Sequence, residues 1–270
     1  DKLSLGIVKN PINNFIPKSD VLVVAKQYPS YSDLYKYGFL HLRVKTYKEA
    51  NTLVDMFKLS TEAKNSGFSE FEGVDVLTHN HDMLDKLLAS GIYKKICIHL
   101  IDNKIWEVVK KYQDTVQVLI WVHGAEIRSW SRRSYEKQRL GEVESNRQHK
   151  LSLQRKVFWN NLVNNELSQN TQLIFVSNYF LNECEKDLGI NFPKHQTHVI
   201  HNFIDNTLFN YVPKESKQRF KVLSIRPCAN LGYANDLTVE AILDLSKNPQ
   251  FNKFEFTLCG DGELFEETVQ

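Results

Sequence analysis

The sequence predicts an α/β fold built on an open parallel sheet that is covered on both faces. Short apolar segments alternate with helical patterns almost from the start of the chain, which is typical of successive strand and helix units. Residues 21–25 form a continuous apolar run, and in residues 116–122 only Gln117 interrupts the apolar sequence. Continuous runs favour a parallel sheet with both faces buried. At 270 residues, the chain is long enough for two domains.

The first part of the chain supplies most of the predicted elements. Strands are expected at residues 21–25, 53–59, 73–77, 96–100, 116–122, 173–176 and 197–200. Helices are expected within residues 31–50 and 131–167, and at 83–89, 105–112 and 178–188. In the first of these helices, the inward positions are predicted to be Leu34, Phe39, Leu42 and Tyr47. In the long one, Leu151, Phe158 and Leu162 share one face.

A linker at residues 206–217 separates two predicted domains, because this stretch contains Pro213 and no periodic pattern. The N-terminal domain spans residues 1–210 and the C-terminal domain residues 218–270. The second contains strands at 220–225 and 254–258 and a helix at 236–246. So few elements cannot bury a doubly wound sheet by themselves. We therefore expect that the chain is truncated or that another chain completes the second domain.

The composition excludes several classes of protein. A net charge of +2 argues against a general nucleic-acid-binding protein. The four cysteines are widely spaced and form neither a CxxC pair nor a zinc pattern, which favours a reducing, cytoplasmic location. No apolar run approaches the roughly 18 residues that a membrane span needs, and there is no signal peptide. Any membrane contact is therefore expected to be peripheral.

The charge is unevenly distributed along the chain. Residues 128–156 carry nine Lys and Arg against three Glu, and Arg128, Arg132 and Arg133 open this stretch. One interpretation is a solvated helix face. The other is a surface for an anionic partner, either a membrane surface or a lipid-phosphate-linked acceptor.

Chemically capable residues follow the predicted strands. These are His123-Gly124-Ala125-Glu126, Ser177-Asn178, His201-Asn202, Arg226-Pro227 and Cys259-Gly260-Asp261-Gly262. In an open parallel α/β sheet, ligands bind outside the carboxyl ends of the strands. We therefore expect these residues to line one cleft.

Each of these groups has a functional and a structural interpretation. His123 can donate to a sugar hydroxyl or a phosphate, or it can be a structural histidine at a turn, and Glu126 can accept from hydroxyls. Arg226 suits bidentate capture of a diphosphate, or a surface ion pair. The glycine turn at residues 260–262 can present backbone amides to a nucleotide or act as a simple turn. Ser177 is better explained as a helix cap, although it also lies at a strand end.

A metal site is not predicted. His79, His81 and Asp82 follow one strand, but their spacing places no third ligand beside them. His99 is expected to be a packed residue and not a catalyst.

Taken together, these motifs resemble the retaining GT-B glycosyltransferases of glycosyltransferase family four. The resemblance covers most of the chain from about residue 21. It is carried by Val122-His123-Gly124 with Glu126, Phe175-Val176-Ser177, Val199-Ile200-His201-Asn202-Phe203-Ile204-Asp205, Leu223-Ser224-Ile225-Arg226-Pro227 and Leu258-Cys259-Gly260-Asp261-Gly262. It implies two Rossmann-like domains, the second incomplete here, which face a cleft and transfer a sugar from a nucleotide-sugar donor.

The resemblance also implies site roles. His123 would contact the donor sugar with Glu126 beside it, and Arg226 would neutralise the diphosphate. The donor site would further include Ser177, Asn202 and the turn Gly260, Asp261 and Gly262. No cofactor is implied, because the nucleotide sugar is the substrate. Such enzymes generally need no metal, and no acidic DxD pair stands at a strand end here. The partners would be that donor, a glycan or lipid-linked acceptor and an anionic membrane surface, with Arg128, Arg132 and Arg133 on the acceptor or membrane side.

Two departures from the family pattern affect the predicted function. Family members usually carry a Lys shortly after the Arg of the second domain, whereas residues 229–233 contain none. The family's paired glutamates would fall beyond Gln270. The main hypothesis is a glycosyltransferase for a polysaccharide or glycoconjugate. The alternatives are a nucleotide-sugar epimerase of the same architecture and a non-catalytic, glycosyltransferase-like partner subunit.

Overall fold

A computed structural model describes residues 16–34, 36–62 and 66–269, and its chain divides into two compact units. The first unit holds the residues up to Ser129 together with His149–Asp205. The second holds Trp130–Gln148 and the residues from Asn206 onward. Residues 130–148, which the sequence places in the N-terminal domain, therefore group with the C-terminal residues. The division falls within one long helix.

The first unit is built on an eight-stranded sheet of order β3-β4-β2-β1-β5-β6-β7-β8. All neighbouring strands are parallel except β3 and β4, which are antiparallel. The strands are β1 (Val21–Ala25), β2 (Asp55–Leu59), β3 (Gly67–Phe71), β4 (Val74–His79), β5 (Lys95–His99), β6 (Gln117–Val122), β7 (Thr171–Phe175) and β8 (Thr197–Val199). The predicted α/β class with a parallel sheet is confirmed.

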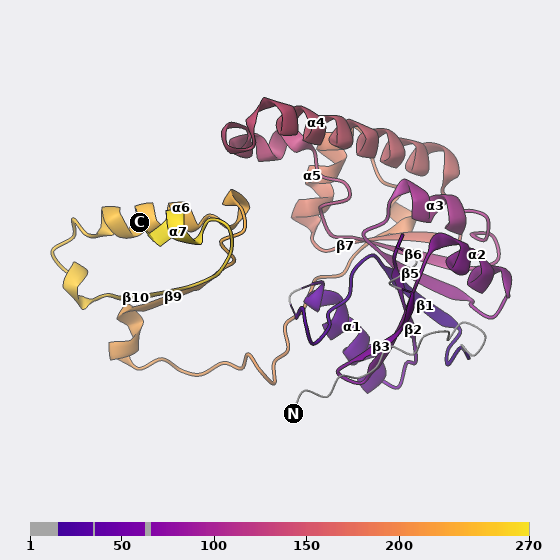
Figure 1. Ribbon diagram of the computed structural model, residues 1–270, viewed down its shortest axis with the longest axis horizontal. Helices are drawn as coiled ribbons and strands as arrows, with labels where there is room; N and C mark the ends of the chain where they lie inside the picture. The colour runs from indigo at the N-terminus through magenta and orange to yellow at the C-terminus, as the bar shows by residue number, and fades with distance from the viewer. Residues whose placement is uncertain (1–15, 35, 63–65, 270) are drawn as a thin grey trace. The chain divides into compact units, whose positions relative to one another are not determined.

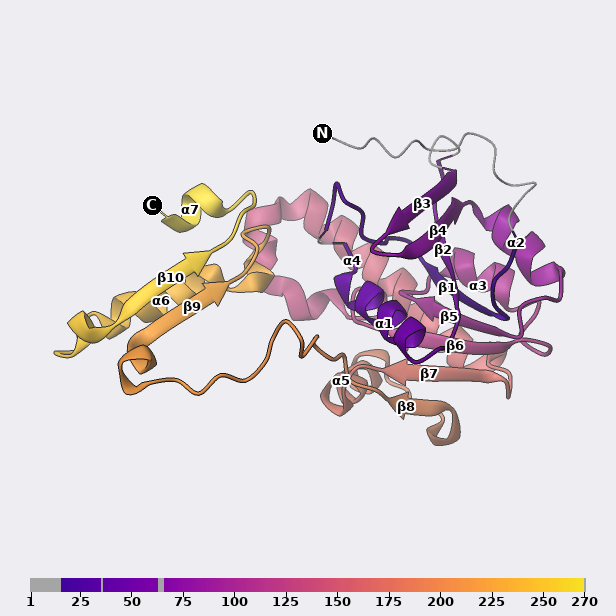
Figure 2. The same cartoon turned by 90° about the horizontal axis from the view of Figure 1, so that it is seen from below.

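Helices cover both faces of this sheet (Figure 1). The helices are α1 (Gly38–Glu49), α2 (His81–Ala89), α3 (Asn103–Val109), α4 (Lys137–Asn161), the π-helical turn η4 (Leu162–Glu166), α5 (Asn178–Leu188) and the 3-10 turn η5 (Lys194–Gln196). The larger core lies under α2, α3, α5 and the end of α4, whereas α1 packs on the opposite face, as Figure 2 also shows. Strand β1 contributes to both cores, because Leu22 faces one and Val23 the other. This explains its unbroken apolar sequence.

Three details differ from the sequence prediction. The edge strand β3 was not predicted. Helix α1 buries Leu40 and Val44, which were not predicted. Of the predicted inward set, Phe39 is partly buried against the core, whereas Leu34 is 67% exposed in the preceding loop. Helix α4 is interrupted at Gly141, whose φ of 73° lies in the left-handed region that favours glycine. Of the predicted stripe, Leu162 is fully buried and Phe158 packs against the core, and Trp159, which was not predicted, is fully buried as well.

The second unit contains a two-stranded parallel sheet, β9 (Lys221–Ile225) and β10 (Glu255–Cys259). Its other elements are the 3-10 turns η3 (Trp130–Glu136), η6 (Ser216–Phe220), η7 (Leu231–Tyr233) and η8 (Phe251–Lys253), and the helices α6 (Asn235–Leu245) and α7 (Phe265–Val269). Aromatic contacts join the start of the two strands, with the ring centroids of Phe220 and Phe254 5.3 Å apart. The side chains of β9 are largely exposed.

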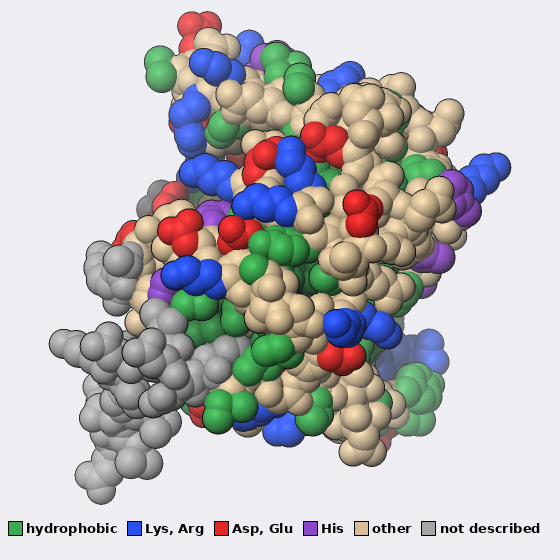
Figure 3. Space-filling view, turned by 90° about the vertical axis from the view of Figure 1, so that its right-hand side faces the viewer, with side chains coloured by type: hydrophobic (Ala, Val, Ile, Leu, Met, Phe, Trp, Pro, Cys, Tyr) green, Lys and Arg blue, Asp and Glu red, His purple; other side chains and the backbone are tan. Residues whose placement is uncertain are grey.

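Within the described ranges, no helix combines the length and the apolar character that crossing a bilayer requires. On the face seen in Figure 3, Lys and Arg side chains lie among Asp and Glu side chains. Such interspersed charge agrees with the small net charge of the chain.

Candidate functional site

The carboxyl ends of the parallel strands in the first unit bring together several predicted site residues. His123 follows β6, Ser177 follows β7 and Asn202 comes three residues after β8. These strands are neighbours in the sheet, so their ends lie along one edge. This is the edge at which parallel α/β folds bind ligands.

The turn after β6 is closed by the carboxylate of Glu126. Its Oε1 accepts the His123 amide at 2.5 Å and its Oε2 accepts the Gly124 amide at 2.8 Å. Gly124 has a φ of 142°, and a Cβ there would meet the Arg128 side chain at 3.5 Å. From α4, Trp159 Nε1 donates to the Glu126 carbonyl at 2.9 Å. Glu126 thus has a structural role that the sequence did not predict, because it fixes the backbone that carries His123.

The imidazole of His123 pairs with a second histidine. His123 Nε2 lies 3.0 Å from Nδ1 of His99, a fully buried residue of β5. Burial, with the positive charge of Arg43 as a smaller cause, lowers the pKa of His123 to about 4. Burial also lowers the pKa of His99 well below its ordinary value. Both rings are therefore neutral at pH 7, so that one donates and the other accepts the shared hydrogen bond.

Arg43 of α1 lies beside this pair, although the sequence analysis did not single it out. Its guanidinium carbon is 3.8 Å from the ring centroid of Trp121, and Nη2 donates to Asn202 Oδ1 at 3.4 Å. The structure thus connects Asn202 with the surroundings of His123. One feature of the sequence could have identified Arg43 as a site residue. It is a charged residue that falls between Leu40 and Val44 on the inward face of a helix.

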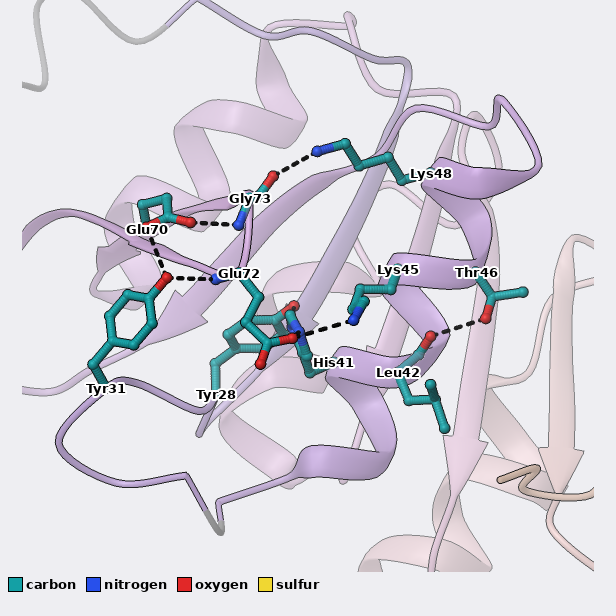
Figure 4. Close-up of polar contacts among 10 residues, drawn as sticks. All are labelled: Tyr28, Tyr31, His41, Leu42, Lys45, Thr46, Lys48, Glu70, Glu72 and Gly73. Atoms are coloured by element: carbon teal, nitrogen blue, oxygen red, sulfur yellow. Dashed lines mark hydrogen bonds and ion pairs between the residues drawn. The ribbon is translucent and has the colours of Figure 1, made fainter. Parts of the chain in front are cut away.

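A hydrogen-bonded chain fixes α1 and the loop after β1 (Figure 4). Tyr28 Oη lies 2.8 Å from His41 Nδ1, and His41 Nε2 lies 3.1 Å from Glu72 Oε2, which also accepts from Lys45 Nζ at 3.2 Å. Burial lowers the pKa of His41, whereas the hydrogen bond from His41 lowers the pKa of Glu72. Glu72 has a φ of 45°, a conformation that is unfavourable for a side-chain-bearing residue. These contacts position the helix that carries Arg43.

Ser177 has a clear structural role. Its Oγ accepts the Phe180 amide at 3.1 Å and so caps the N-terminus of α5. The structural interpretation of Ser177 is therefore confirmed. Its role in donor binding stays a prediction.

In the second unit, Arg226 and the glycine turn lie side by side at the ends of β9 and β10. The Arg226 amide donates to the Cys259 carbonyl at 2.9 Å, and its Nη1 donates to the Tyr233 carbonyl at 2.9 Å. A Cβ on Gly260 would lie 2.2 Å from the Arg226 carbonyl oxygen, and one on Gly262 would lie 2.6 Å from the Cys228 carbonyl carbon. Both glycines are thus required for close backbone packing.

The remaining predicted residues are spread over the two units. The Asp261 carboxylate accepts the adjacent Gly262 amide at 2.8 Å. Arg128, in the first unit, lies with its guanidinium carbon 5.2 Å from the Phe180 ring centroid. Arg132 and Arg133 belong to the second unit, where Arg133 pairs with Glu136 at 2.5 Å.

One cavity of the first unit lies apart from the predicted site residues. A cavity of about 510 Å³ is lined by residues at the start of β2 and β4, such as Asp55, Met56 and Val74. None of the predicted site residues lines it. Among the residues that the structure describes, no group of three His, Cys, Asp or Glu is placed to hold a metal.

The sequence matches no protein-family profile, and no curated protein is similar to it. Among solved structures, the chain is similar to a glycosyltransferase from Rickettsia africae ESF-5, with a TM-score of 0.53 at 10% identity over 90% of this chain and 68% of that one. Weaker similarities are to a trehalose-6-phosphate synthase (TM-score 0.48, 12% identity, 93% and 67% covered) and to a UDP-N-acetylglucosamine 2-epimerase from Rickettsia bellii (TM-score 0.42, 11% identity, 92% and 63% covered). The first similarity shows a shared fold, and the predicted GT-B-like α/β class is confirmed.

Proposed function

We propose that this chain is a retaining glycosyltransferase that moves a sugar from a nucleotide-sugar donor to a polysaccharide or glycoconjugate acceptor. The observation that carries the proposal is the placement of His123. It is a neutral, half-buried imidazole at the carboxyl end of β6, in a fold shared with a glycosyltransferase. That edge of the sheet is where such folds bind ligands.

In this proposal, His123 contacts the donor sugar. Its Nε2 is occupied by His99, and within the described part of the chain Nδ1 has no hydrogen-bond partner. When His99 Nδ1 donates to His123 Nε2, the neutral His123 ring carries its proton on Nδ1. That N–H can then donate to a sugar hydroxyl. Glu126 acts by holding the turn and accepts from donor hydroxyls with its remaining lone pairs.

In the second unit, Arg226 and the turn of Gly260, Asp261 and Gly262 take the nucleotide diphosphate. In the first unit, Asn202 and Ser177 are further donor-binding residues in this proposal. The diphosphate gains negative charge as it leaves. A preorganised guanidinium and backbone amides stabilise that charge in the transition state. The donor is a substrate and not a cofactor, and in this proposal Arg226 and the backbone amides take the part that a metal ion would play on the diphosphate.

The test is a titration with nucleoside diphosphate combined with an assay of donor hydrolysis and transfer. We expect Arg226→Ala to weaken diphosphate binding by about tenfold or more, because it removes a charge-assisted contact. We expect His123→Ala to lower donor turnover by about tenfold or more with little change in diphosphate affinity. Arg219→Ala, on the exposed turn η6, is the matched control. Unchanged binding and turnover in both variants would refute the assignment.

A non-catalytic partner subunit is the second candidate, because residues 229–233 contain no Lys to assist Arg226. In place of a phosphate contact, Asn230 Oδ1 in this segment accepts the Gly232 amide at 3.0 Å. Wild-type protein that binds no nucleoside diphosphate in the same titration would favour this candidate.

We further propose that the chain is cytoplasmic and binds an anionic membrane surface or a lipid-linked acceptor through Arg128, Arg132 and Arg133. The exposed side chains of Val143 and Val157 on α4 support this, because interfacial helices combine apolar and basic residues.

Vesicle flotation tests the membrane proposal. Vesicles with anionic lipids should bind the protein at low salt and lose it steeply as the salt concentration rises. Arg132→Gln with Arg133→Gln should weaken binding to these vesicles, and neutral vesicles provide the control. Binding that ignores both salt and the substitutions would contradict the proposal.

A further inference from the structure

Arg43 is a buried cation without a matching anion. Its side chain on α1 is 4% exposed, and Nε is buried without any hydrogen-bond partner. Among the described residues, no carboxylate lies within ion-pair distance of it. A buried charge is costly unless an opposite charge or several hydrogen bonds compensate it. Such a group therefore needs an explanation beyond packing.

The surroundings of Arg43 hold its guanidinium in one orientation. The guanidinium carbon lies 3.8 Å from the centroid of Trp121, and on another side it lies 5.4 Å from the centroid of Phe203. Stacking on an aromatic face fixes the plane of the group and therefore the directions of its N–H bonds. A guanidinium held in a fixed plane can donate two parallel hydrogen bonds to two oxygens of a carboxylate or phosphate.

One edge of the Arg43 guanidinium is only weakly occupied. Nε and Nη2 form the side edge of a guanidinium, and here Nε has no partner. Nη2 donates to Asn202 Oδ1 at 3.4 Å, at the long limit of a hydrogen bond. Asn202 is exposed, so its carboxamide can rotate away and release this edge.

The neighbouring polar groups leave the positive charge uncompensated. His99 and His123 are neutral at pH 7, and nearby Tyr47 is a neutral phenol, because burial raises its pKa. The cluster lies at the carboxyl ends of β5 and β6, at the edge where ligands bind. An oxyanion that arrives there would meet one full positive charge and an exposed amide.

We propose that Arg43 and Asn202 form an oxyanion-binding site in the first unit, which takes a carboxylate or phosphate group of a ligand. The anion's oxygens replace the Asn202 carboxamide oxygen at the Nε and Nη2 edge, and the Asn202 amide turns its N–H toward the anion. The proposal concerns a different charge from the diphosphate partner Arg226. It holds whether or not the chain transfers sugars.

Calorimetric titration with inorganic phosphate, glucose 6-phosphate and glucuronate tests this site. Every protein carries Arg226→Gln, so that anion binding in the second unit does not contribute. We expect Arg43→Met to weaken binding by about tenfold or more, because the charge-assisted bidentate contact is lost. Lys48→Met, which removes an exposed charge from the same helix, should leave the affinity unchanged. The preferred ligand distinguishes a phosphate site from a carboxylate site.

A second variant keeps the test decisive if Arg43→Met fails to fold. Asn202→Asp places a permanent carboxylate beside Arg43, so we expect a higher Tm and about tenfold weaker anion binding. Absence of binding to all three probes by the protein with Arg43 and Asn202 intact would overturn the proposal. So would an anion affinity in both Arg43→Met and Asn202→Asp that equals the affinity of the protein with Arg43 and Asn202 intact.

Discussion

Replacing Glu126 with alanine should lower the free energy of unfolding of the first unit by roughly 3 kcal/mol, because hydrogen bonds to charged groups contribute about 1.5–3 kcal/mol each. The Glu126 carboxylate accepts two backbone amides, those of His123 and Gly124, and its side chain is 7% exposed. Alanine leaves both amides without this acceptor. Burial raises the pKa of Glu126 but does not remove the two bonds that hold the turn.

Urea unfolding followed by tryptophan fluorescence measures this loss, because Trp106, Trp121 and Trp159 all lie in the first unit. Glu126→Gln should lose less than Glu126→Ala, since one amide oxygen can still accept a backbone N–H. Glu49→Ala removes an exposed carboxylate at the end of α1 and should have little effect. If Glu126→Ala unfolds at the same urea concentration as Glu49→Ala, the turn does not depend on this carboxylate.

The sequence was sufficient to predict the edge of the sheet where the candidate site lies. Parallel strands place their carboxyl ends together, so the residues after each apolar run become neighbours without any knowledge of loop paths. His123 and Asn202 were identified in this way, and the structure connects both with Arg43. The same reasoning holds for Arg226 and Gly260 in the second unit, which follow paired strands.

The sequence could not predict interactions that depend on the phase of a helix or on pairing between distant segments. Helix α1 buries Leu40 and Val44, and this phase turns Arg43 toward β6. The predicted phase placed Phe39, Leu42 and Tyr47 inward and so concealed Arg43.

Glu72 depends on a hairpin whose first strand, β3, has the sequence GFSEF. Its glycine and two polar residues give a weak strand signal, and only pairing with β4 defines it. The contact between Glu72 and His41 joins this hairpin to α1, so sequence spacing alone could not reveal it.

The two paired histidines should make the stability of the first unit depend on pH. The pKa of His123 is about 4 in the folded protein and about 6.5 in an unfolded chain, so the unfolded state binds an extra proton between these values. The stabilisation is fully present above pH 6.5 and is lost as the pH falls toward 4. A difference of 2.5 units corresponds to about 3 kcal/mol from this one residue. His99, whose pKa is lowered further by burial, acts in the same direction.

Urea unfolding at a series of pH values from 7 to 4 measures this effect. His123→Asn keeps a polar side chain at the turn but cannot titrate, so the number of protons taken up on unfolding near pH 5 should fall by about one. The proton uptake on unfolding that is due to His99 should persist in that variant. His195→Asn replaces an exposed histidine of η5. The slope of the free energy of unfolding against pH should be the same in this variant as in the wild type. Equal slopes for His123→Asn and the wild type would mean that His123 is not held neutral, and the proposed contact of this ring with a donor sugar would lose its physical basis.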